Sequence, residues 1–156
     1  MTSVYRILRK AYARKPFDGE GAYRFGGRWS SAGVRLAYTA EHLSLAIIEY
    51  FVHIDADDPP KDLVVVNAKI PDTVSRVTVP VGGLPRNWRA IPPPPELAEI
   101  GDDFVRRGQA AILIVPSALA PTESNWLINP RHPSFRKIRL NVPEPFQYDP
   151  RFFSTK

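Results

Sequence analysis

Two apolar segments limit the folds open to this chain more than any other feature of its sequence. They are DLVVVNAKI at residues 62–70 and AAILIVPS at residues 110–117, and runs of this kind predict buried strands. The elements around them follow the order strand, helix, strands, helix, strands. This order lacks the regular alternation of strand and helix that builds a parallel sheet, so the sequence predicts an α+β fold.

Local patterns predict the remaining elements. These are a strand over 34–39, a helix over about 40–53, an edge strand over 73–81, a helix over 95–108 and a strand over 135–142. Thr39 is placed to cap the first helix, and Gly108 to end the second. Pro80 assigns its strand to a sheet edge, because proline cannot donate to a ladder. Residues 4–12 are too short to assign.

Several classes of protein are excluded by composition. The chain has no cysteine, which rules out disulfides, thiolate chemistry and cysteine-type zinc sites. No apolar run approaches the roughly 20 residues that a membrane span needs. The opening residues MTSVYRILRKAYARK lack the features of a signal peptide. We expect one domain over residues 1–156, located in the cytoplasm and without a membrane partner.

The net charge of +5 is unevenly distributed. Residues 1–35 carry eight arginines and lysines against two acids, and residues 131–156 carry six against two, whereas residues 41–62 carry six acids against one lysine. A basic surface indicates an anionic ligand or partner, such as nucleic acid or a phosphorylated small molecule, or simply a solvated face. No helix-turn-helix, RNP or zinc-finger pattern is present, which disfavours direct reading of nucleic acid.

The helix predicted over 40–53 is apolar on almost every side. Its single polar stripe carries His42, Glu49 and His53. A helix of this kind is expected to be mostly buried. Glu49 then either sits at a small solvent window, paired with an arginine, or lines a cleft. The spacing of the three residues is not a ligand pattern, so we expect no metal site.

Other polar residues give weaker signals when taken alone. Ser117 ends an apolar strand, but the G-x-S-x-G pattern of a serine hydrolase is missing. Asn125 and Asn129 are turn-like by default. The segment GGR at 26–28 matches neither a P-loop nor a dinucleotide-binding glycine motif.

Taken together, these segments resemble the RES-domain family, the toxin half of RES–Xre type II toxin–antitoxin modules. The resemblance rests on GAYRFGGRWSSAG, LAYTAEHLSLAIIEYFVH, LPRNW, AAILIVPSALAPTESNWLINPRHPSF and PFQYDPRF, in that order, and covers nearly the whole chain. The family is named for an arginine, a glutamate and a serine, which match Arg28, Glu49 and Ser117. One departure is Ser30, where many members have asparagine after GGRW.

The resemblance implies an ADP-ribosyltransferase-like fold, with a mixed or antiparallel sheet core and flanking helices. It implies that NAD+ is bound as a substrate, with no separate cofactor, and that its nicotinamide–ribose bond is broken by an NAD+ glycohydrolase or phosphorylase. Phosphate is the acceptor in the second case. Depletion of NAD+ then arrests growth. The implied partner is an Xre-type helix-turn-helix antitoxin, which alone brings the toxin to DNA.

Each matched residue suits this chemistry. Nicotinamide leaves as a neutral group, so the site needs no general acid, but Glu49 would stabilise positive charge on the ribose. Arg28, after two permissive glycines, would anchor the phosphates. Tyr38 would hold the cationic ring by stacking. Ser117 would contact the ribose or orient Glu49, and Asn125 would support the site or the nicotinamide amide.

Two alternatives to NAD+ degradation remain open. One is transfer of ADP-ribose to a protein target from the same site, and the other is a non-enzymatic basic module that binds nucleic acid. Trp29, next to Arg28, is either a pocket wall or a core anchor that fixes its loop, and we favour the anchor.

Overall fold

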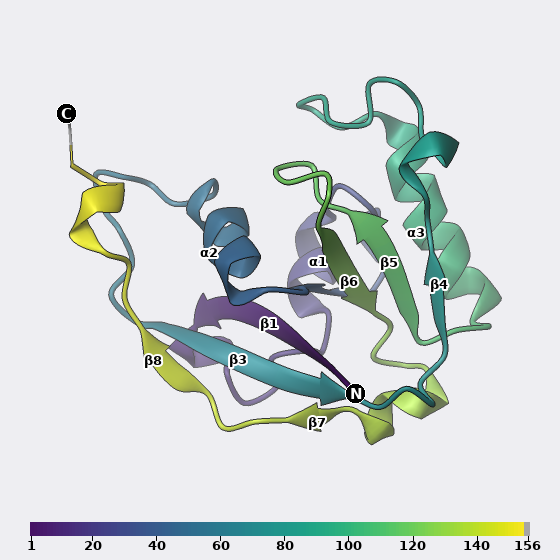
Figure 1. Ribbon diagram of the computed structural model, residues 1–156, viewed down its shortest axis with the longest axis horizontal. Helices are drawn as coiled ribbons and strands as arrows, with labels where there is room; N and C mark the ends of the chain where they lie inside the picture. The colour runs from purple at the N-terminus through teal and green to yellow at the C-terminus, as the bar shows by residue number, and fades with distance from the viewer. Residues whose placement is uncertain (155–156) are drawn as a thin grey trace.

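One mixed β-sheet organises residues 1–154, the part of the chain that the computed structural model describes (Figure 1). Its strands lie in the order β4-β5-β6-β2-β1-β3-β7, and β8 also pairs with β3. Only β4 and β5 run parallel, and every other pair is antiparallel. The strands are β1 (Thr2–Arg9), β2 (Ala37–Ala40), β3 (Leu63–Ile70), β4 (Arg76–Thr78), β5 (Ile112–Pro116), β6 (Ser124–Ile128), β7 (Arg139–Leu140) and β8 (Glu144–Phe146).

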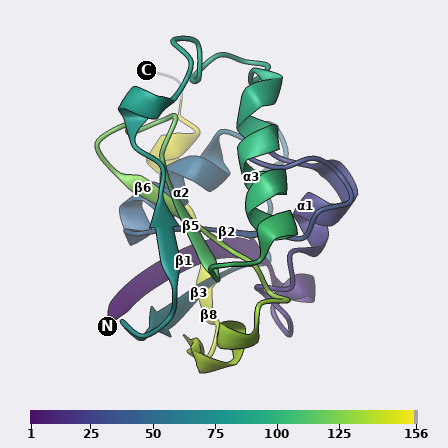
Figure 2. The same ribbon diagram turned by 90° about the vertical axis from the view of Figure 1, so that its right-hand side faces the viewer.

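Helices flank the sheet at two separate places. Figures 1 and 2 show α3 beside β4 and β5, and α2 stands at the far side of β6. The α-helices are α1 (Glu20–Phe25), α2 (Leu43–Phe51) and α3 (Pro95–Arg107), and the short 3-10 turns are η1 (Lys10–Tyr12), η2 (Val81–Gly83), η3 (Pro133–Lys137) and η4 (Pro150–Phe152). None of the helices formed by residues 1–154 combines the length and apolar character needed to cross a bilayer.

Strand alternation divides the core between the two faces of the sheet. In β5, Ile112 packs into a cluster on one face, whereas Leu113 and Val115 pack into a cluster on the other. The second cluster includes Leu97 of α3. A third cluster joins Leu45 of α2 to β1 and β3. The second and third clusters lie on the same face of the sheet, because Tyr38 and Ala40, two residues apart on β2, pack into one each. Helices α2 and α3 therefore cover different strands of that face, and the strand ends between them are available for a site.

Much of the predicted fold is confirmed. The α+β class, both buried strands and the helix over 95–108 are present. The strand predicted over 34–39 is found at 37–40, and the one predicted over 73–81 is shorter, at 76–78, but does lie at a sheet edge. Gly108 ends α3 with a φ of 61°, a left-handed conformation that glycine adopts without steric cost. The order of elements in the sequence was therefore sufficient to predict the class of fold.

The prediction for α2 is wrong in two respects. Thr39 does not cap it, because Thr39 belongs to β2 and donates its hydroxyl to the Trp126 carbonyl at 2.7 Å. The helix begins only at Leu43, after strand pairing ends. Nor is the helix mostly buried: Ile48 is 43% and Val52 53% exposed, because α2 packs on the sheet by one side only.

Three further segments differ from expectation. The strand predicted over 135–142 is reduced to β7, because η3 occupies residues 133–137. The unassigned residues 4–12 contribute most of β1, which pairs with β3 along its whole length. Asn125 is not in a turn but in β6, between β2 and β5. Asn129 does occupy a turn, where its Oδ1 accepts from the Arg131 amide at 3.0 Å.

Candidate active site

The loop GGRWS is fixed by its glycines and its tryptophan. Gly26 has a φ of 70°, and a Cβ on Gly27 would lie 2.6 Å from the Tyr38 hydroxyl oxygen. Trp29 is 2% exposed and packs against Trp88, with ring centroids 6.5 Å apart. The core-anchor interpretation of Trp29 is therefore confirmed. Because this indole is buried in the core, the backbone of the neighbouring Arg28 is held in place.

Arg28 lies against a second loop, formed by residues 85–90. Its Nη1 donates to the Trp88 carbonyl at 2.9 Å and to the Ala90 carbonyl at 3.0 Å. Partial burial lowers the pKa of Arg28, while the charges of Glu49 and Tyr38 act in the opposite direction. Glu49 is therefore close enough to Arg28 to act on it electrostatically, although the two form no ion pair.

Tyr38 stands on β2 and supports the GGRWS loop. Its hydroxyl accepts from the Trp29 amide at 3.1 Å and shares a hydrogen bond of 2.8 Å with the Ser30 Oγ. Burial raises the pKa of Tyr38 to about 12, so the phenol is neutral at physiological pH. Ser30, the departure from the resemblance, is 1% exposed and serves this contact.

Glu49 and Ser117 meet across the sheet face, although 68 residues separate them in sequence. The Ser117 Oγ donates to the Glu49 Oε1 at 2.6 Å. The same oxygen accepts from the amides of Leu119 and Ala120, at 3.1 and 3.2 Å. Ser117 is fully buried. Glu49 therefore has a defined polar contact with Ser117, and among the described residues it forms no ion pair with an arginine, as the solvent-window interpretation would require.

These four residues gather between α2 and α3. Directly paired residues of antiparallel strands point to the same face, which places Tyr38 of β2, Leu127 of β6 and Leu113 of β5 in one row. Ser117 follows β5 four residues after Leu113, where its amide still bonds to the Glu123 carbonyl, so it shares that face. Arg28 and Glu49 approach the same face from a loop and from α2.

Asn125 lies on the same sheet face but has a different contact. Its row contains Ala40 of β2 and Val115 of β5. The side-chain nitrogen donates to the Thr39 carbonyl at 3.3 Å. The described residues include no hydrogen bond from Asn125 to Glu49 or Ser117. The structure therefore places Asn125 near the site without joining it to the Glu49–Ser117 pair.

The three residues of the predicted polar stripe have different surroundings, and of the three only Glu49 lies within α2 itself. Nδ1 of His42 lies 2.8 Å from a Glu123 oxygen, and Glu41 is near both, so this partly exposed trio could be taken for a metal site. Glu41 is already engaged by the Ser124 amide at 2.8 Å. Since exposed acidic groups often gather without a metal, the trio supports no argument for one.

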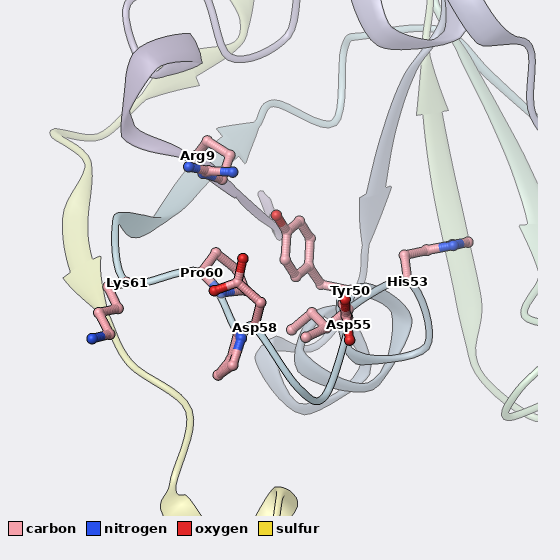
Figure 3. Close-up of a pocket in the computed structure, with 9 residues that line it drawn as sticks. Arg9, Tyr50, His53, Asp55, Asp58, Pro60 and Lys61 are labelled. Atoms are coloured by element: carbon pink, nitrogen blue, oxygen red, sulfur yellow. The ribbon is translucent and has the colours of Figure 1, made fainter.

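His53 lines a separate hollow of about 500 Å³ beyond the end of α2 (Figure 3). Figure 3 shows Arg9, Tyr50 and Asp58 around it, from three different segments, and Asp55 and Lys61 also line it. None of the predicted site residues lines this hollow. The chemistry suggested by the sequence therefore lies outside this hollow.

Comparison with known proteins first defines the class of fold. The crystal structure of the M. tuberculosis MbcT–MbcA toxin–antitoxin complex contains a similar chain, with a TM-score of 0.73 over 93% of this chain and 84% of that one. The sequence identity is 18%, so this likeness concerns the fold alone. It agrees with the predicted α+β architecture.

The family follows from the sequence. The family model described as RES domain matches residues 3–149, and the chain therefore belongs to the RES domain family. It is 36% identical to Toxin Res of Yersinia enterocolitica, over 95% of this chain and 97% of that protein. It is 37% identical to Toxin Res of Pseudomonas putida (94% and 99%), and 36% identical to the Prs ADP-ribosylating toxin of Sphingobium sp. (96% of each).

One part of the site was missed by sequence reasoning. The carbonyls of Trp88 and Ala90 hold Arg28, and Arg89 between them donates from Nε to the Ala118 carbonyl at 2.8 Å. Every residue type has a backbone carbonyl, so no sequence pattern could have predicted that these two carbonyls accept hydrogen bonds from Arg28. The segment LPRNW was quoted for the resemblance, and its aromatic and basic residues were the available signal.

Proposed function

We propose that this chain is the toxin of a type II toxin–antitoxin module and that it cleaves the nicotinamide–ribose bond of NAD+. The observation that carries the proposal is the hydrogen bond from Ser117 to Glu49, close to Arg28 and Tyr38, in a chain of the RES domain family. Relatives named Toxin Res, at 36–37% identity over nearly full length, support it.

Glu49 suits the central step. As the bond breaks, the nicotinamide nitrogen takes the electron pair and leaves neutral, and positive charge develops on the ribose. A fixed carboxylate stabilises that charge more in the transition state than in the ground state. Ser117 holds Oε1, whereas Oε2 has no hydrogen-bond partner within residues 1–154 and is free to contact the ribose.

Tyr38 and Arg28 suit the two ends of the substrate. The Tyr38 hydroxyl is engaged within the protein, so the ring face is what this residue offers to the cationic nicotinamide. In Arg28, Nη1 is engaged by carbonyls, and Nε and Nη2 remain for a phosphate. Asn125 would contact the nicotinamide amide or support Thr39. NAD+ is then a substrate, and no resident cofactor or metal is needed.

The acceptor distinguishes two forms of this proposal. Water gives an NAD+ glycohydrolase and phosphate gives a phosphorylase. The 36% identity to a protein named ADP-ribosylating toxin favours a third acceptor, a protein side chain, as a second candidate function. All three share the same bond cleavage and the same site.

The proposed partner is an antitoxin. The similar fold in the MbcT–MbcA crystal structure was solved as a toxin–antitoxin complex, which supports a protein partner of this kind. We propose an Xre-type helix-turn-helix antitoxin, with DNA reached only through it. The cytoplasm, where NAD+ is abundant, is the proposed location.

The test is nicotinamide release from NAD+ by the purified chain, with and without phosphate. Glu49→Gln keeps the shape of the side chain but removes its charge. We expect it to lower kcat by about 100-fold or more, as loss of transition-state electrostatics does. The matched control is Glu99→Gln, an exposed acid on α3, which should retain wild-type rates.

Each outcome separates the candidates. A phosphate-dependent rate identifies a phosphorylase, and label from NAD+ on a protein target identifies transfer. Full activity of Glu49→Gln contradicts the site. A wild-type chain that leaves NAD+ intact while binding nucleic acid in a salt-sensitive manner contradicts the function itself.

A further inference from the structure

The loop of residues 85–90 joins two parts of the candidate site. Trp88 is 6% exposed and anchors the loop in the core beside Trp29. Arg28 holds the carbonyls on either side of Arg89, and the Arg89 Nε donates to the Ala118 carbonyl. Ala118 follows Ser117 directly, so the Arg89 guanidinium lies beside the turn that orients Glu49.

The Nη groups of Arg89 make fewer hydrogen bonds within the protein than those of Arg28. It is exposed, and within residues 1–154 it forms no ion pair with a carboxylate. Its Nε is engaged, but both Nη groups have no hydrogen-bond partner among the described residues. Two such nitrogens form the fork that binds a phosphate in a bidentate manner. Arg28 by contrast has Nη1 committed to two carbonyls.

We propose that Arg89 is a second diphosphate-binding residue of the candidate site, acting together with Arg28. This inference rests on the proposed function and deepens it, since the ligand class is an ADP-ribosyl compound. A diphosphate carries two negative charges, and two guanidinium groups from adjoining loops match them. The Ala118 contact holds Arg89 in position, so less side-chain entropy is lost when the ligand binds.

The test compares Arg89→Gln with Arg86→Gln, a control in the same loop that is also exposed and whose side chain forms no hydrogen bond or ion pair with the described residues. The first readout is the Kd of ADP-ribose by calorimetry, which needs no catalysis. We expect Arg89→Gln to weaken binding by about tenfold or more, the value of a charged hydrogen bond. Arg86→Gln should stay within about twofold.

The second readout is nicotinamide release from NAD+ and from nicotinamide riboside, which has the same scissile bond without phosphates. Arg89→Gln should raise KM for NAD+ and leave kinetics with the riboside unchanged. Equal losses with both substrates, an unchanged Kd for ADP-ribose, or no ADP-ribose binding by the wild type would overturn the assignment. Failure of the wild type to release nicotinamide, with ADP-ribose binding still dependent on Arg89, contradicts only the proposed function.

Discussion

The Ser117 hydroxyl has a single proton, and residues 1–154 place only one acceptor to receive it. Two backbone amides, of Leu119 and Ala120, donate to its oxygen, so the proton is directed to Glu49. The turn after β5 therefore determines which carboxylate oxygen is engaged. A buried serine that is saturated in this way orients a neighbour and has no lone pair left to act as a nucleophile.

Tyr38 gives a prediction in which stability depends on pH. Burial raises its pKa from 10.0 to about 12, so the folded protein retains the proton over a range where the unfolded chain loses it. The stabilisation is fully present below pH 10 and is lost as pH rises through about 12. Tyr38→Phe cannot ionise in either state.

We expect Tyr38→Phe to lower the free energy of unfolding by about 1 kcal/mol at pH 7, because the Trp29 amide and Ser30 lose a partner. Above pH 10 the difference from wild type should shrink. Urea unfolding of both proteins between pH 7 and pH 11 measures it, and contributions from other tyrosines cancel in the comparison. A difference that stays constant with pH would contradict the assigned cause.

At the scale of elements, α3 and the GGRWS loop meet at a glycine. A Cβ on Gly101 would overlap the Trp29 carbonyl oxygen, which is backbone and cannot move aside without displacing the loop. We expect Gly101→Ala to destabilise the chain by roughly 3 kcal/mol or more, despite the better helix propensity of alanine. Gly21→Ala on α1, where nothing lies within 4 Å, should instead be neutral or stabilising.

Thermal unfolding of the two glycine variants measures the contrast. If α3 can shift freely, Gly101→Ala will unfold like Gly21→Ala, and the loop does not depend on this helix. If the contact is rigid, nicotinamide release should also fall in Gly101→Ala, because Arg28 leaves the same loop.

Elements with continuous apolar runs could be predicted from the sequence. Elements that form only because neighbouring strands pair with them could not. Strand β5 is apolar throughout, and α3 has its own stop signal in Gly108. Strand β6 begins with Ser124 and Asn125 and resembles a turn locally. It becomes a strand because β2 and β5 both pair with it and bury Leu127. Pairing of this kind is a tertiary effect that overrides local preference.

The candidate site divides in the same way. Local patterns drew attention to Glu49 and Ser117, and the resemblance joined them to Arg28, but their spacing alone gave no reason to expect a contact. The hydrogen bonds that hold Arg28 are accepted by the backbone carbonyls of residues 88 and 90, which any residue type would supply. The burial of α2 was overestimated because an apolar helix surface does not reveal whether the rest of the chain covers it.

At the scale of the whole molecule, the end of the chain holds the helix that carries Glu49. Tyr148 donates its hydroxyl to the Ile47 carbonyl at 2.6 Å, two residues before Glu49. It also packs against Phe51, with ring centroids 5.9 Å apart, and Phe152 and Phe153 contact the same ring. Because α2 packs on the sheet by one side only, this aromatic cluster supplies further packing that holds the helix in place.

Removal of this support should therefore affect both stability and catalysis. We expect Tyr148→Ala to lower the free energy of unfolding by about 3–5 kcal/mol, as truncation of a buried aromatic does. Phe25→Ala, at a position 85% exposed, should lower it by less than about 0.5 kcal/mol. At a temperature where circular dichroism shows both variants folded, kcat for nicotinamide release should fall in Tyr148→Ala alone. An unstable Tyr148→Ala variant with wild-type kcat would mean that the sheet positions Glu49 without help from the C-terminal segment.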